Sequence, residues 1–110
     1  MQFNVTDTEP ALVISIGENR IDAAIATRFK DKLREVILRH HKPVEMHMSA
    51  VDFMDSSGLG AMIALRKAMP AELPMILVGL TPNVERVFRL TRMDSVFDIR
   101  TANTNEEQRE

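Results

Sequence analysis

The sequence contains no cysteine, tryptophan or tyrosine, and glycine accounts for only 4 of its 110 residues. Without cysteine, disulfides and thiol chemistry are excluded, which fits a reducing cytoplasm. Its five phenylalanines are the only aromatic residues, so there is little from which to build the stacking platforms of single-strand binders. A net charge of −2, with basic residues scattered along the chain, argues further against nucleic acid as a partner.

Long apolar runs are also absent. No run approaches the roughly 18 residues that cross a bilayer, and the first ten residues lack the basic and apolar regions of a signal peptide. The sequence therefore predicts a cytoplasmic protein without a membrane span. Its length and its 45% apolar content suffice for one hydrophobic core. We expect a single domain over residues 1–100 and a polar, disordered tail over residues 101–110.

Apolar residues recur with two periods along the chain. Alternation and short β-branched runs predict strands, and three- and four-residue steps predict helices. We expect strands near residues 3–5, 11–16, 44–50, 74–79 and 96–99, a turn over residues 6–10, and helices over residues 23–40, from the serines to Pro70, and from Pro82 to Thr91. Alternating strands and helices imply parallel crossovers, and the opening hairpin implies a mixed sheet. The predicted fold class is α/β, with a mixed sheet of four to five strands.

Two adjacent serines, Ser56 and Ser57, stand where the strand pattern changes to the helical one, in the segment VDFMDSSGLGAM (residues 51–62). A serine nucleophile at such an elbow needs a glycine two residues before it and a basic partner. Met54 and Asp55 occupy those positions, and none of the three histidines is placed to face the junction. The lone GxG that follows has neither the third glycine of a dinucleotide-binding fingerprint nor the lysine of a phosphate-binding loop. Neither hydrolysis nor nucleotide binding is favoured.

Two interpretations of the serines remain. The first is helix capping, in which Asp55 or Ser56 accepts hydrogen bonds from the first amides of the helix. Asp55 alone could do this, which would leave the Ser56 hydroxyl free. The second is covalent modification, because a helix N-terminus accepts negative charge. A phosphate beside Asp52 and Asp55 would make this face strongly acidic and would repel a docked partner without disrupting the fold.

The segment FMDSSGLG (Phe53–Gly60) resembles the signature of the STAS domain, specifically that of bacterial anti-sigma-factor antagonists. Two further segments agree with this resemblance. NRIDAA, at residues 19–24, resembles the entry to the family's first helix, and GLTPNV, at residues 79–84, resembles its later strand, loop and helix. The resemblance runs from residue 9 to residue 100.

The resemblance implies a small mixed sheet with helices packed mainly on one face, and a protein that is not an enzyme. The partner would be an anti-sigma factor that is also an ATP-dependent serine kinase. The unphosphorylated antagonist would bind this kinase and release the sigma factor. Phosphorylation of Ser56 would end the binding, and a serine phosphatase would restore it. No cofactor or metal would be needed, since ATP would belong to the kinase.

Roles for the neighbouring residues follow from the same resemblance. Asp55 would orient or tune the Ser56 hydroxyl, Ser57 would support the turn, and Gly58 would keep the backbone open. Met54, a flexible side chain beside the motif, is expected to help form an adaptable docking patch. The partner-binding face would comprise Asp22, Met54, Leu59 and Gly60.

The chain departs from the family pattern in three places. His47 stands where an acidic or amide residue is common, Arg92 stands where many members have glycine, and residues 101–110 show no clear amphipathic helix. A second hypothesis therefore stays open, namely a STAS module that is not switched. Such a module could be an accessory subunit of a lipid transport complex or a signalling scaffold.

Overall fold

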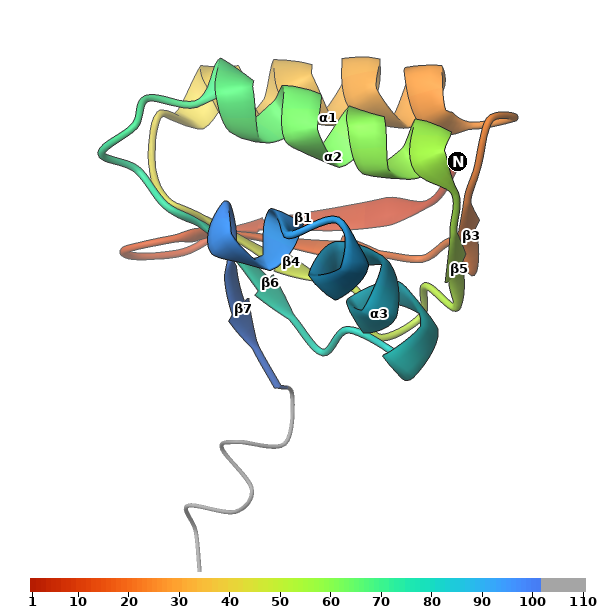
Figure 1. Cartoon of the computed structure of the whole chain (residues 1–110). Helices are drawn as coiled ribbons and strands as arrows, with labels where there is room; N and C mark the ends of the chain where they lie inside the picture. The colour runs from red at the N-terminus through yellow and green to blue at the C-terminus, as the bar shows by residue number, and fades with distance from the viewer. Residues whose placement is uncertain (102–110) are drawn as a thin grey trace, which may run out of the picture.

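The computed structural model describes residues 1–101, which form an α/β domain around one mixed sheet (Figure 1). In chain order the elements are β1 (Phe3–Asp7), β2 (Leu12–Ile16), β3 (Arg20–Ile21), α1 (Ala26–His40), β4 (Val44–His47), β5 (Phe53–Met54), α2 (Ser56–Ala68), β6 (Met75–Val78), α3 (Pro82–Leu90), the 3₁₀ turn η1 (Met93–Ser95) and β7 (Asp98–Arg100). The predicted tail, apart from Thr101, lies outside the described residues.

The main sheet has five strands in the order β1-β2-β4-β6-β7. β1 pairs antiparallel with β2, and the remaining neighbours are parallel. Each parallel pair is joined through a helix, as the long crossover between parallel strands requires. The predicted α/β class with a mixed sheet is therefore confirmed.

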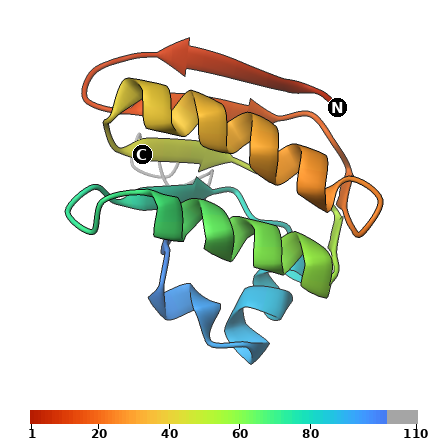
Figure 2. The same ribbon diagram turned by 90° about the horizontal axis from the view of Figure 1, so that it is seen from above.

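Two helices, α1 and α2, lie side by side over one face of this sheet (Figures 1 and 2). The strand residues that face them are fully or almost fully buried, in two registered rows: Leu12, Val44 and Met75, then Ile14, Met46 and Leu77. Alternate strand residues point to the opposite face, where they are half-buried or exposed. The core thus lies between the helices and the sheet.

The third helix, α3, lies beside the sheet edge and contacts the short strand β5. Its apolar face buries Val84 and Phe88. The Phe88 ring meets the Phe97 ring edge-on, with 5.4 Å between centroids, a favourable aromatic geometry. Through its contact with β5, α3 lies next to the segment that precedes the serines.

The start of α1 differs from the prediction. The helix begins at Ala26 rather than Ala23, because Asp22 organises a turn in front of it. The Asp22 carbonyl oxygen accepts the amides of Ile25 and Ala26, at 3.1 and 2.8 Å. Its carboxylate accepts the amide of Ala24 at 3.1 Å. Asp22 therefore caps a preceding turn and not the helix itself.

The strand boundaries also need correction. β1 continues to Asp7, into the predicted turn, because its register with β2 extends that far. β4 ends at His47, where the chain turns, and the Val51 amide donates back to the Met48 carbonyl at 3.0 Å. β7 begins at Asp98, after η1. The two-residue strands β3 and β5 were not predicted, because two residues carry no periodicity.

Candidate functional site

The serine motif begins α2, and Asp55 is its N-cap. The backbone of Asp55 is extended, and its Oδ1 accepts the amide of Gly58 at 3.0 Å. Its Oδ2 accepts the amide of Ala23, from the loop before α1, at 3.2 Å. One carboxylate thus fixes the start of α2 and ties it to a segment 32 residues earlier in the chain. The capping role predicted for Asp55 is confirmed.

Both serine side chains, Ser56 and Ser57, are exposed in the first turn of α2. Neither hydroxyl makes a hydrogen bond to any residue within 1–101. The first amides of a helix have no intrahelical partner. Of these amides in α2, the Asp55 carboxylate accepts only that of Gly58. The Ser56 hydroxyl therefore stands free beside backbone N–H groups at the positive end of the helix dipole.

Gly58 is required by the close approach of α2 to β3. A Cβ at this position would overlap the carbonyl oxygen of Ile21 and lie 2.9 Å from the Met54 Cγ. The obstacle is backbone, which cannot rotate away. The short strands β3 and β5 pair with each other in a separate two-stranded sheet, the β3–β5 ribbon. The absence of a side chain at Gly58 lets the motif pack directly on this ribbon, more closely than the sequence indicated.

This ribbon presents a charged and aromatic surface that the sequence analysis missed. The guanidinium of Arg20 lies 4.5 Å from the centroid of the Phe53 ring, and the two residues are registered partners in β3 and β5. Phe53 is 41% exposed, which is unusual for a large aromatic side chain. Little in the sequence points to this pair, because neither Arg20 nor Phe53 belongs to a periodic pattern.

Asp22, predicted to lie near the docking face, is adjacent to this surface. Its Oδ2 accepts a hydrogen bond from the Nε of Arg20 at 3.2 Å. This bond holds the pKa of Asp22 below its ordinary value, against a smaller opposing effect of desolvation, and the amide of Ala24 adds to the lowering. The Asp22 side chain is thus a positioned carboxylate on the same side of the molecule as Asp55.

The loop in front of the motif is anchored from α3. The Thr81 hydroxyl donates to the Val51 carbonyl at 2.8 Å, and the Asn83 amide group donates to the Asp52 carbonyl at 3.4 Å. On its other side, the amide of Asp52 donates to the Asn19 carbonyl at 2.8 Å. The backbone of Asp52, whose side chain is exposed, is therefore anchored from both sides just before the motif.

Two residues predicted to bind a partner are buried instead. Met54 is 3% exposed and Leu59 is 8% exposed, and both belong to the hydrophobic core. This burial corrects the prediction that their side chains form a docking patch, because in this structure a partner cannot reach them. Gly60, by contrast, is exposed, and nothing lies within 4 Å of the place that its Cβ would occupy.

A shallow hollow of about 300 Å³ lies between α1 and α2, next to the motif. Ser57 and Gly60 line it from α2. From α1 it is bounded by Thr27 and by Lys30. Ser57 thus faces the neighbouring helix, whereas Ser56 does not line this hollow. The two hydroxyls differ in surroundings although they are adjacent in sequence.

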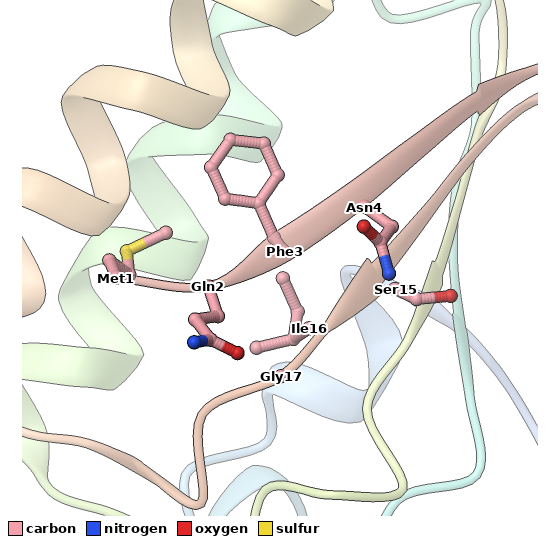
Figure 3. Close-up of a pocket in the computed structure, with 7 residues that line it drawn as sticks. All are labelled: Met1, Gln2, Phe3, Asn4, Ser15, Ile16 and Gly17. Carbon is pink, nitrogen blue, oxygen red and sulfur yellow. The ribbon is translucent and has the colours of Figure 1, made fainter.

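A second hollow, of about 440 Å³, lies at the free end of the β1–β2 hairpin (Figure 3). It is lined by Met1, Gln2, Phe3, Asn4, Ser15, Ile16 and Gly17. These residues supply no ionisable side chain, and none of them belongs to the serine motif. The hollow is therefore not part of the candidate site.

The structure places two of the departures from the family pattern away from the motif. Arg92 adopts a left-handed conformation, with φ of 62°, where glycine is the favoured residue. His47 lies on the face of the sheet opposite α1 and α2, and its Nε2 is 2.8 Å from the Glu45 Oε2. Neither residue contributes to the surface around Ser56.

Within residues 1–101 no cluster of three or more His, Cys, Asp or Glu side chains could hold a metal ion. No helix in that part of the chain is long and apolar enough to cross a membrane. The described hydrogen bonds of His40 and His47 go to the Val36 carbonyl and to Glu45, not to either serine. A serine nucleophile in the motif thus has no histidine base bonded to it.

Comparison with known proteins gives consistent results. Anti-sigma-B factor antagonists of Listeria monocytogenes and Listeria innocua are each 26% identical over 101 residues, covering 91% of this chain and 87% of theirs. An anti-sigma factor antagonist from Mycobacterium paratuberculosis has a similar structure, with a TM-score of 0.79 at 25% identity over 90% of this chain and 84% of that one. The phosphorylated form of the Bacillus cell fate determinant SpoIIAA shares the fold, with a TM-score of 0.70 at 20% identity over 96% of each chain.

The family model of the STAS domain matches residues 2–108, eight residues beyond the predicted domain boundary. This match includes the serine motif, the β3–β5 ribbon and all three helices. It agrees with the resemblance carried by residues 53–60. The chain therefore belongs to the STAS domain family.

Proposed function

We propose that this protein is an anti-sigma-factor antagonist whose binding is switched off by phosphorylation of Ser56. One observation carries the proposal, namely that the Ser56 hydroxyl is exposed and unbonded at a helix start that Asp55 already caps. A cap alone would not need this hydroxyl. In line with its family, the protein is a binding module and not an enzyme.

The partner would be an anti-sigma factor with serine kinase activity, which would bring its own ATP. In the transfer, the Ser56 Oγ attacks the γ-phosphorus of ATP, and a new O–P bond forms as the bond to the β-phosphate oxygen breaks. ADP leaves, and the hydroxyl proton passes to a base of the kinase. The Asp55 carboxylate already accepts two amides, so its role would be to fix the helix start.

The physical effect of the phosphate follows from its surroundings. It adds about −1.5 to −2 charges at neutral pH. The backbone amides behind Ser56 would tolerate this charge, whereas Asp22, Asp52 and Asp55 already make the surrounding surface acidic. Any acidic group on the docking surface of the partner would be repelled by the added charge. A partner packed closely against this face would also have no room for the phosphate at the centre of the contact.

The named relatives support this assignment. Two of them are anti-sigma-B factor antagonists, and the structure of SpoIIAA, which shares the fold, is known in an unphosphorylated and a phosphorylated form. A serine phosphatase would reverse the modification, and the exchange would take place in the cytoplasm. On the surface of this chain, Asp22, Ser57 and Gly60 would surround the phosphorylated residue, and the buried Gly58 would hold the helix start beneath it.

The test is intact-mass spectrometry of the protein isolated from its own cells with phosphatases inhibited, followed by fragmentation across residues 51–62. We expect one phosphate, on Ser56, that is lost in Ser56→Ala and kept in Ser57→Ala. An unmodified mass under every growth condition would favour the non-switched module instead. A phosphate on Ser57 would move the assignment by one residue.

Binding supplies the second arm of the test. Ser56→Asp should retain the fold and weaken binding to the anti-sigma factor, whereas Ser56→Ala should bind like the wild type and resist inactivation by kinase and ATP. Ser57→Asp is the matched control, because it adds the same charge one residue away. Equal binding by wild type and Ser56→Asp would refute the electrostatic explanation.

A further inference from the structure

Gly60 is a glycine that the folded chain does not need. It lies inside α2, in the second turn, and a Cβ built there would meet nothing within 4 Å. Glycine in place of alanine inside a helix lowers the folding equilibrium constant about fivefold. At Gly58 this cost is offset because only glycine fits against Ile21. At Gly60 the described residues offer no such compensation.

The position of Gly60 relative to Ser56 suggests why a side chain is absent at position 60. The two residues are four apart in the same helix, so they lie one above the other on one face. Side chains of a helix lean toward its N-terminus and cover the preceding turn. A side chain at position 60 would therefore extend over the surface around the Ser56 hydroxyl.

The surface around Gly60 is open. Of residues 56–62, only Ser56, Ser57 and Gly60 are exposed. Gly60 lines the shallow hollow between α1 and α2 together with Ser57, and it lies four residues after Ser56 in the same helix. Gly58, by contrast, is pressed against the β3–β5 ribbon. A side chain at position 60 would therefore reduce the open surface next to both serines.

We propose that Gly60 is a positioning residue for phosphorylation, because its missing side chain leaves the room that a kinase needs to close over the Ser56 hydroxyl. This inference rests on the proposed function. It adds that access to Ser56, and not only the charge around it, determines the rate of transfer. Gly60 itself would touch neither ATP nor the reacting atoms.

The test uses full-length protein with alanine or glutamine at position 60. Both residues favour helix, so each variant should melt about 4 °C above the wild type. Ala71→Gln, at an exposed position beyond the far end of α2, is the control for added bulk. The kinase is purified from extracts of the source cells. Its activity is followed during purification by the transfer of labelled phosphate from ATP to the wild-type protein.

We expect kcat/KM for phosphorylation to fall about tenfold in Gly60→Ala. In Gly60→Gln it should fall about a hundredfold, the effect of a misplacement of about 1 Å at a reacting centre. The control should react like the wild type. A purely structural role would move melting temperature and rate in the same direction, whereas positioning moves them in opposite directions.

Phosphorylation of Gly60→Gln at the wild-type kcat/KM, with its melting temperature raised, would overturn this inference and leave the proposed function intact. A source-cell extract that phosphorylates no serine of the wild-type protein would instead overturn the proposed function itself. The two failures are therefore distinguishable in one set of reactions.

Discussion

Substitution of Gly58 by alanine tests the packing on which the whole motif rests. The added Cβ would overlap the Ile21 carbonyl oxygen and press on the Met54 Cγ at 2.9 Å. Met54 is flexible and can move aside, whereas the carbonyl belongs to the β3 backbone. The variant can therefore relieve the overlap only by separating α2 from the ribbon.

The expected loss of stability combines two opposing effects. Overpacking against a rigid obstacle costs about 3 kcal/mol, and replacing a helical glycine by alanine returns about 1 kcal/mol. The net loss is about 2 kcal/mol, or roughly 8 °C in melting temperature for a domain of this size. A displaced ribbon would also stretch the 3.2 Å hydrogen bond from the Ala23 amide to Asp55, so 2 kcal/mol is the lower end of the expected range.

The assay is urea unfolding of wild type, Gly58→Ala and Gly60→Ala, followed by circular dichroism. Gly60→Ala makes the same chemical change two residues later, where space is open, so it should gain about 1 kcal/mol. The two alanine variants should thus differ in sign. If Gly58→Ala were as stable as the wild type, the inferred contact between α2 and the Ile21 carbonyl would be wrong.

Three further predictions concern single side chains. Asp55→Ala should cost about 1–2 kcal/mol in urea unfolding, because the amides of Gly58 and Ala23 lose their acceptor, and Asp55→Asn should cost less because it keeps an acceptor oxygen. Arg92→Gly should gain about 0.5–1 kcal/mol by relieving the left-handed conformation, whereas Arg92→Ala, which keeps that strain, should show no gain. Lys42 donates to Asp7 at 2.6 Å, and this hydrogen bond holds the pKa of Asp7 below 3.8. A lowered folded-state pKa stabilises the protein above the unfolded value, and that contribution disappears as the pH falls through the folded value. The stability advantage of wild type over Lys42→Met should therefore shrink as the pH falls through and below the ordinary pKa of an aspartate, and an advantage that stays constant over this fall would contradict the pairing.

The sequence allowed the main elements of the fold to be predicted, because strong apolar periodicity survives in a single sequence. The strand over residues 12–16 and the end of α1 at His40 agree with the structure to within one residue. The segments without periodicity were missed or displaced. β3 and β5 are held by backbone pairing between residues 33 apart, and no local pattern encodes such a pairing.

The candidate site was predicted in part for the same reason. A helix start is a local feature, so the capping by Asp55 and the free hydroxyl of Ser56 could be inferred from residue types. The partner contacts expected of Met54 and Leu59 were wrong, because burial depends on which side of α2 the ribbon and the sheet occupy. The cation–π pair of Arg20 and Phe53 was likewise invisible, since it joins two segments that only the fold brings together.

By itself, the sequence determined the class of fold, the start of α2 and the chemistry available there, because each depends on spacing within a short segment. Only the tertiary structure decided which side chains around Ser56 a partner can reach, and why Gly58 must be glycine while Gly60 need not be for the fold. These outcomes depend on contacts between distant segments, namely the approach of β3 to α2 and of α1 to Ser57. Such contacts arise from the packing of the whole chain.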